Sequence, residues 1–129
     1  MTLIRRSTPV LAVASVEPTC AFFEKLGLAV TVGVPHGDRL GFAILADGAV
    51  EIMVQSHDSI GDDLGASLTI GRNTALFVEV SDLDAALAAL GDAPVFLPRR
   101  RTFYGSVEVG VVEPGGHHVT LAQFEREGT

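Results

Sequence analysis

The sequence repeats one order of predicted elements: a strand, a helix and three strands. Val13–Gly27 (VASVEPTCAFFEKLG) resembles Val80–Gly91 (VSDLDAALAALG), and each segment follows a strand that opens with threonine. In both segments apolar residues recur at helical spacing and a glycine ends the helix. Neither half can bury its sheet alone, so the repeat predicts a fold of two similar modules. The expected fold class is α+β, with two βαβββ modules in tandem in a single domain, residues 1–129.

The first module is predicted to cover about residues 8–55. Ser15 offers a capping hydroxyl and Pro18 tolerates the first helical turn, so a helix is expected after Ser15. The predicted strands are 8–14, 28–34, 39–46 and 49–55, and the apolar helical stripe spans 19–26. Pro35–Asp38 is predicted to be a turn, and the Asp47-Gly48 pair favours a hairpin.

A glycine- and aspartate-rich connector, about residues 56–73, leads to the second module at about residues 74–125. One helical turn is predicted near Asp62–Leu68. In the second module Ser81–Asp84 resembles a capping box before a helical stripe that ends at Gly91. The predicted strands are 74–80, 93–97, 103–112 and 118–124, with 98–101 as a loop.

The charge balance excludes a typical nucleic-acid-binding surface. The formal net charge is −7, and Arg99–Arg101 is the one basic cluster of the 129 residues. Nucleic-acid binding would need a wider basic face. No apolar run approaches the roughly 20 residues that span a bilayer, and the N-terminus does not read as a signal peptide. With a single cysteine, Cys20, the sequence predicts no internal disulfide and a cytoplasmic protein.

Two motifs, together with the duplicated module, give the chain a family resemblance. The motifs are FFEKLGL at residues 22–28 and EPGGHHVTLAQF at residues 113–124. The chain resembles the vicinal oxygen chelate superfamily from about Thr8 to Phe124. That superfamily includes glyoxalase I, extradiol dioxygenases, fosfomycin-resistance enzymes and bleomycin-resistance binding proteins. The resemblance implies two sheets curved into a cup. It also implies pairing of modules within or between chains, so a homodimer is expected.

The resemblance also implies where a divalent metal would bind. Metalloenzymes of the superfamily place His, Glu or Gln, His and Glu on four strands. The corresponding positions here are Thr8, Glu51, Ala75 and Thr120. Only Glu51 is a ligand of the expected kind. We therefore expect no metal and no cofactor.

Residue alternation in the predicted strands selects the candidates for a ligand site. His118 and Thr120 share one strand face, Glu51 lies opposite the apolar face of its strand, and Phe77 shares a face with Ala75. Near the loop 98–101, Arg101 is the arginine expected to point inward and grip an anion. The predicted ligand-binding residues are Glu51, Phe77, Arg101, Tyr104, His118 and Thr120, and the candidate catalytic residues are Glu51 and His118.

Each candidate also has a structural interpretation. Glu51 can belong to a solvated strand face and Phe77 can fill the space between the sheets. Arg99 and Arg100 can belong to a solvated loop. The remaining histidines, His36, His57 and His117, are expected on the surface or rim, and Cys20 is expected to be inert packing.

Three functions follow from these residues. The preferred one is a metal-independent binding protein that encloses a small organic ligand in the cup. The first alternative is a glyoxalase- or dioxygenase-type metalloenzyme with a displaced site made of Glu51, His118 and either Glu79 or Glu108. The second is a metal-free isomerase or lyase with Glu51 or His118 as its base. Whether the protein is an enzyme is left open.

Overall fold

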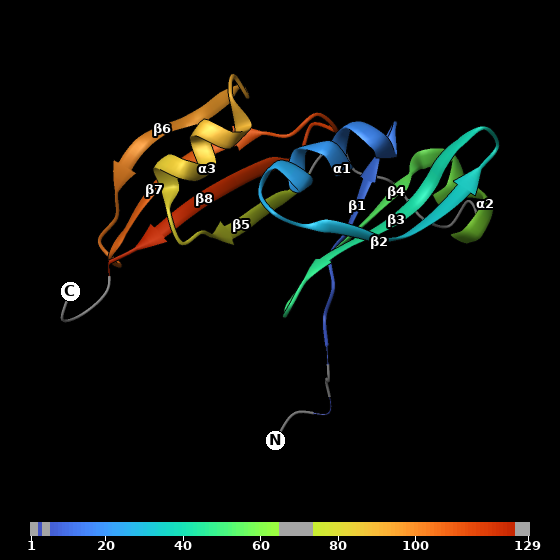
Figure 1. Ribbon diagram of the computed structural model, residues 1–129, viewed down its shortest axis with the longest axis horizontal. Coiled ribbons are helices and arrows are strands. Elements are labelled where there is room, and N and C mark those ends of the chain that lie inside the picture. The colour runs from blue at the N-terminus through green and yellow to red at the C-terminus, as the bar shows by residue number, and fades with distance from the viewer. Residues whose placement is uncertain (1–2, 4–5, 65–73, 126–129) are drawn as a thin grey trace. The chain divides into compact units, whose positions relative to one another are not determined.

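The computed structural model describes residue 3 and residues 6–64 and 74–125. The chain forms two compact units, Met1–Ile70 and Gly71–Thr129. Each unit contains a four-stranded sheet, and the order strand, helix, strand, strand, strand occurs in both (Figure 1). The α+β class and the two βαβββ modules predicted from the repeat are confirmed.

Unit 1 places its first strand beside its last. The sheet order is β1-β4-β3-β2, with β1 parallel to β4 and the other pairs antiparallel. The elements are β1 (Val10–Val13), α1 (Val16–Lys25), β2 (Ala29–His36), β3 (Arg39–Asp47), β4 (Val50–Ser56) and α2 (His57–Leu64).

Helix α1 covers one face of the unit 1 sheet through contacts with β2, β3 and β4. Val16, Cys20 and Phe23 of the helix are buried, as are Leu45 and Val54 of the strands. Removing such apolar side chains from water stabilises the unit by roughly 1.5–3 kcal/mol for each large residue. Alternate residues of β3 and β4 therefore belong to the other face, which α1 leaves uncovered.

Helix α2 follows β4 without a loop and contacts β1, β3 and β4. The Ser56 hydroxyl accepts a hydrogen bond from the Ser59 backbone N–H at 3.2 Å, which caps the new helix. His36, at the end of β2, lies 2.7 Å from the Asp62 carboxylate. The predicted helical turn near Asp62–Leu68 thus begins earlier, at His57, and residues 65–68 lie outside the described part of the chain.

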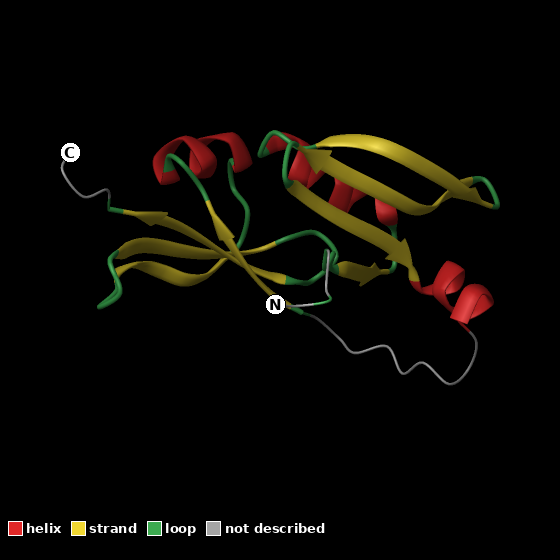
Figure 2. Ribbon diagram, turned by 90° about the horizontal axis from the view of Figure 1, so that it is seen from below, coloured by secondary structure: helices red, strands yellow, loops and turns green. Residues whose placement is uncertain are grey.

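Unit 2 repeats the same strand order with a shorter helix. The sheet order is β5-β8-β7-β6, with β5 parallel to β8. Helix α3 lies on one side of this sheet and contacts β8 (Figure 2). The elements are β5 (Ala75–Glu79), α3 (Leu83–Leu90), β6 (Val95–Arg101), β7 (Ser106–Val112) and β8 (His118–Phe124).

Strand β6 differs from the sequence prediction because it continues through Pro98 to Arg101. The segment 98–101 was predicted to be a loop. Proline cannot donate to a ladder, yet an edge strand tolerates it, and β6 is at the edge of its sheet. The register against β7 also shifts twice, between Val95 and Leu97 and between Leu97 and Arg100. The next strand starts at Ser106, since residues 102–105 form the hairpin turn.

The helix caps also differ from prediction. Ser15 occupies the N-cap of α1 but its side chain makes no capping hydrogen bond. In α3 the cap is Asp82, whose carboxylate accepts from the Ala85 backbone N–H at 3.0 Å, instead of Ser81. Pro18 lies inside the first turn of α1, as predicted, where a missing N–H costs nothing.

His117 was predicted to lie on the surface or rim, and that prediction is wrong. The side chain is 2% exposed, and its Nδ1 accepts a hydrogen bond from the Thr74 backbone N–H at 2.7 Å. The buried Glu113 carboxylate accepts from the backbone N–H groups of Gly115 at 2.8 Å and His117 at 3.1 Å. These bonds fix the turn between β7 and β8 and join it to the start of β5.

Among the described residues, none of the helices has both the length and the apolar character that crossing a bilayer requires.

The assignment of the α3 cap gives the first prediction. Asp82→Ala should lower the free energy of unfolding by about 1 kcal/mol, because the Ala85 N–H loses its acceptor. Ser81→Ala is the matched control and should change it by less than about 0.5 kcal/mol. Urea denaturation followed by circular dichroism measures both. An equal or larger loss in Ser81→Ala would contradict the assignment.

Candidate functional site

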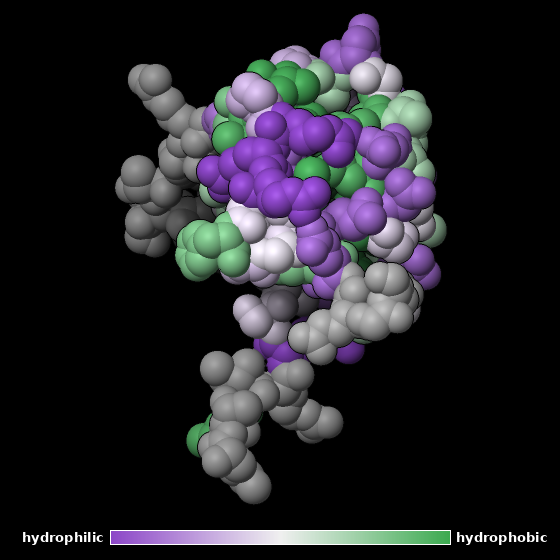
Figure 3. Space-filling view, turned by 90° about the vertical axis from the view of Figure 1, so that its left-hand side faces the viewer, coloured by the Kyte–Doolittle hydropathy of each residue, from purple (hydrophilic) through white to green (hydrophobic). Residues whose placement is uncertain are grey.

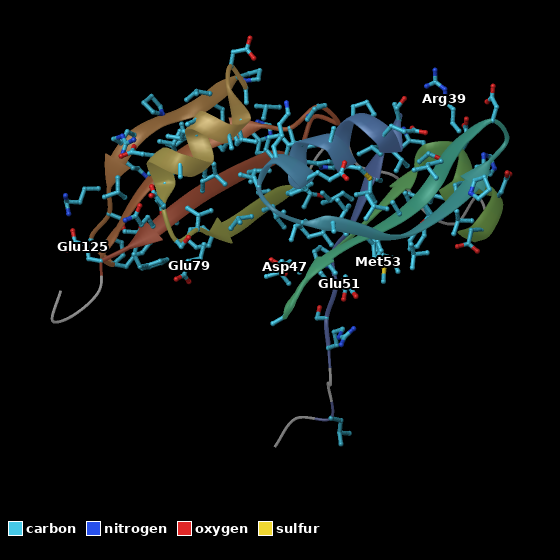
Figure 4. The ribbon with its side chains drawn as sticks, viewed as in Figure 1. Arg39, Asp47, Glu51, Met53, Glu79 and Glu125 are labelled. Atoms are coloured by element: carbon cyan, nitrogen blue, oxygen red, sulfur yellow. The ribbon has the colours of Figure 1, made fainter. Side chains whose placement is uncertain are left out.

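Each sheet has one face that its first helix does not cover, called here the helix-free face. In unit 2 this face carries Phe77 and Glu79 of β5, and it continues across β8, β7 and β6. Because β5 and β8 are in register with Phe77 opposite Thr120 and Glu79 opposite Ala122, the β8 residues on this face are His118, Thr120, Ala122 and Phe124. Figure 4 labels Glu79 on the side of β5 away from α3, and Glu51 and Met53 on the side of β4 away from α1.

The helix-free face of unit 2 contains a fully buried carboxylate, Glu108 of β7. Its side chain is 0% exposed. Oε1 accepts from Arg100 Nε at 3.2 Å and from Arg100 Nη2 at 3.0 Å. Oε2 accepts from the Ser106 hydroxyl at 2.9 Å and from the Tyr104 hydroxyl. The Glu108 cluster, defined as Arg100, Tyr104, Ser106 and Glu108, therefore satisfies both carboxylate oxygens.

The cluster decides the charge state of Glu108. Burial by itself raises the pKa of the carboxyl, because the charged form loses its hydration. Hydrogen bonds from Tyr104, Ser106 and Arg100, with the Arg100 charge, outweigh burial and hold the pKa of Glu108 below its ordinary value. The hydrogen bond and the charge of Glu108, with Tyr104 adding to the effect, raise the pKa of Arg100 although burial opposes it. Glu108 is consequently an anion at neutral pH and a poor general acid.

Aromatic side chains lie beside the Glu108 cluster. The ring centroids of Phe77 and Phe124 are 6.2 Å apart, and those of Phe124 and Tyr104 are also 6.2 Å apart. Phe77 is 54% exposed and Tyr104 is 45% exposed. Rings exposed at this level leave apolar surface that a planar molecule can cover. Figure 3 views the molecule from the end where β6 and β7 lie, and on this surface hydrophilic residues (purple) are next to hydrophobic residues (green).

A second aromatic contact occupies the other end of the same face. The rings of Phe96 and His118 are 4.5 Å apart at an interplanar angle of 77°, an edge-to-face contact. Phe96 lies over Gly110, since a Cβ at Gly110 would come within 2.5 Å of its ring. His118 is thus placed on the helix-free face, as alternation predicted, and it contacts a phenylalanine there.

The three arginines of β6 have different partners. Arg100 lies opposite Glu108 and Arg101 lies opposite Val107, so the two side chains belong to opposite faces of the sheet. Arg101, the arginine expected to point inward, pairs with the exposed Glu125, and Arg99 pairs with Asp84 at 2.6 Å. Exposed pairs of this kind add little stability. Sequence reasoning named Glu108 only as one option for a metal ligand and did not connect it with Arg100.

Glu51 belongs to unit 1 and has partners of its own. Its Oε1 accepts from the Thr8 hydroxyl at 3.1 Å, and its Oε2 lies 3.6 Å from Arg6 Nη1. The side chain is 24% exposed. It borders a hollow of about 310 Å³ whose lining is Arg6, Ser7, Thr8, Gly48, Ala49, Val50 and Glu51. Glu51 and Thr8 are also the first two positions at which the family resemblance expects metal ligands.

These positions do not fit a divalent metal. Thr8 and Glu51 supply one hydroxyl and one carboxylate, and Ala75 and Thr120 of unit 2 supply a methyl group and one hydroxyl. Divalent metals in such sites take imidazole and carboxylate donors. Glu108, an option for a displaced site, has both oxygens engaged in the cluster. Within residues 6–64 and 74–125, no three His, Cys, Asp or Glu side chains come together.

Cys20 does not offer a nucleophile. It is buried in α1, and burial raises the pKa of its thiol to about 11, with Glu24 and Glu17 adding to the effect. The thiolate is therefore scarce at neutral pH.

Comparison with known proteins supports the fold. No family model matches the sequence, and no curated protein matches it either. Among solved structures, TioX from Micromonospora sp. ML1 is similar at a TM-score of 0.76 and 18% identity, over 95% of this chain and 100% of that chain. A glyoxalase/bleomycin resistance protein/dioxygenase from Nocardioides has a TM-score of 0.71 and 21% identity, over 99% and 89% of the two chains.

A third structure has the same fold. It is a glyoxalase/bleomycin resistance protein/dioxygenase family enzyme from Burkholderia phytofirmans PsJN, with a TM-score of 0.71 and 18% identity over 92% of this chain and 98% of that chain.

The Glu108 cluster predicts a pH dependence of stability. Because the folded-state pKa of Glu108 is lowered, its ionisation stabilises the fold at neutral pH, and this stabilisation is lost as the pH falls below the ordinary glutamate value. Glu108→Gln should therefore be less stable than the wild type at pH 7, with a difference that shrinks between pH 6 and pH 3. Urea denaturation at several pH values measures this difference. Glu125→Gln is the control, and a gap for Glu108→Gln that stays constant with pH would contradict the assignment.

Proposed function

We propose that this chain, which has the vicinal oxygen chelate fold, is a metal-independent small-molecule-binding protein. The observation that carries the proposal is the helix-free face of unit 2. There, exposed aromatic rings adjoin an arginine that a buried carboxylate orients. At three of the four positions where metal ligands are expected, Thr8, Ala75 and Thr120, the side chains coordinate poorly. Two of the proteins of similar structure are described as glyoxalase/bleomycin resistance protein/dioxygenase proteins, so the fold alone does not choose among these activities.

In this function five of the six candidate residues have a role. Phe77 and Tyr104 supply apolar contact area for an organic ligand. Thr120, which lies between Phe77 of β5 and Gly110 of β7, supplies a hydroxyl. His118 is held against Phe96 and borders the same surface. Glu51 hydrogen-bonds Thr8 and lines the 310 Å³ hollow of unit 1, where it can contact a ligand in that hollow. We also propose that residues 1–129 act as a single domain and that the ligand is enclosed in a cup.

A ligand screen tests the proposal directly. Purified protein in excess EDTA is melted against a panel of aromatic and polar organic compounds, and at least one compound should raise Tm. For that compound, Phe77→Ala should weaken binding by roughly two- to tenfold, about 0.5–1.5 kcal/mol of stacking energy. The matched control is Val95→Ala, which removes an exposed apolar side chain from β6 of the same unit. Binding that disappears in EDTA and returns with a divalent metal would overturn the proposal.

We also propose that the protein is a homodimer in a cytoplasmic setting. Exposed apolar side chains in both units, such as Val32 and Phe77, are compatible with an interface between copies.

The association state is a separate prediction. Light scattering coupled to size exclusion should give twice the mass of the 13.5 kDa chain across a tenfold dilution series. A mass of one chain at every concentration would contradict the dimer and leave the ligand proposal untouched.

A further inference from the structure

We propose that the ligand of unit 2 is a planar aromatic carboxylate, with its carboxylate on Arg100 and its ring against Tyr104 and the neighbouring phenylalanines. This inference rests on the proposed function and adds the chemical class of the ligand.

The guanidinium of Arg100 retains donors for an outside acceptor. A guanidinium has five N–H groups, and the bonds to Glu108 use Nε and one N–H of Nη2. The Tyr104 hydroxyl also interacts with this guanidinium. The Arg100 side chain is also 52% exposed. The Nη1–Nη2 end is therefore a fork that matches the two oxygens of a carboxylate.

The fork is fixed in position, which is what recognition of a carboxylate needs. Glu108 holds one side of the guanidinium, and Tyr104 and Ser106 hold Glu108 in turn. Burying a carboxylate is unfavourable because it loses its hydration, and replacing a buried ion pair with apolar residues is often neutral or stabilising. The pairing of the buried Glu108 with Arg100 is explained if binding requires the Arg100 guanidinium to keep one orientation. An arginine that is already ordered loses less conformational entropy when it binds.

A register shift is what brings Arg100 to this place. Leu97 pairs with Gly110 and Arg100 pairs with Glu108. Between these two pairs β6 advances by three residues and β7 by two, so β6 contains one extra residue. Without the extra residue, Arg99 would lie opposite Glu108. Bulges of this kind re-aim side chains and occur frequently beside binding sites.

The aromatic surface begins next to the fork. Tyr104 bonds the same carboxylate as Arg100, and its ring continues to Phe124 and then to Phe77. A ligand with a flat ring and an adjacent carboxylate can engage both features at once. A cationic ligand would meet the Arg100 charge first, since Glu108 is covered. Glu79 shares the face but is separated from Glu108 by β8, where Ala122 lies between them.

The test compares a charged probe with its neutral isostere. 2-Naphthoate and 2-naphthamide are titrated into the full chain, with affinity measured by changes in the 1H–15N spectrum. The naphthoate should bind about tenfold or more tightly, the range expected for a charge-assisted, bidentate contact. Arg100→Gln should reduce naphthoate affinity to that of the amide and leave amide affinity unchanged. Arg99→Gln is the matched control, because it removes an exposed arginine from the same strand and should not change the ratio.

Replacing Arg100 leaves the buried Glu108 carboxylate without its cationic partner and can impair folding. A second variant therefore removes the Glu108 charge as well. The double variant Arg100→Gln with Glu108→Gln keeps a hydrogen-bonded pair without burying a charge, and it should show the same loss of selectivity. Equal affinity of wild type for both probes, with dependence on Phe77, would overturn this inference and leave the proposed function standing. An equal loss in Arg99→Gln would overturn it as well, because the effect would then be general electrostatics. Binding of neither probe also overturns it, while the EDTA melting screen decides the proposed function separately.

Discussion

Each sheet of this protein is covered by its first helix on one face only, and the chemistry of the other face depends on that constraint. Side chains alternate across a strand, so one set must be apolar to pack against α1 or α3. Leu45, Val54, Val119 and Leu121 meet this need and are fully buried. The alternate set is released from packing against the helix. Glu51, Phe77, His118 and Thr120 belong to this second set, which is why candidates for binding gather there.

Glu108 differs from the other residues of the helix-free face of unit 2 because it is a fully buried charge. It is as buried as the core residues, yet it is charged and lies on the face without a helix. Its neighbours replace the lost hydration with four hydrogen bonds, from Arg100, Tyr104 and Ser106. A polar network in low-dielectric surroundings is rigid when every member is satisfied. This rigidity gives Arg100 a defined orientation, whereas Arg99 and Arg101 pair with exposed carboxylates that constrain them little.

The comparison with solved structures supports the fold of this chain but does not assign its function. The chain shares its fold with two proteins described as glyoxalase/bleomycin resistance protein/dioxygenase proteins, at 18% and 21% identity. At the positions where the family resemblance expects metal ligands, Thr8, Ala75 and Thr120 are poor donors. A shared sheet arrangement therefore supplies a surface, and the side chains on the helix-free faces decide what that surface binds.

The sequence by itself determined the repeat, the order of strands and helices, and the strand faces of Phe77, His118 and Thr120. These follow from periodicity, which is local and survives small errors in strand boundaries. Tertiary structure alone decided which arginine meets Glu108, that His117 is buried against the backbone of Thr74, and that α2 continues directly from β4. Each of these depends on a pairing between segments far apart in the chain or on one extra residue in a strand. A register shift of one residue exchanges the two faces of a strand, and it is set by the partner strand rather than by the residues that shift.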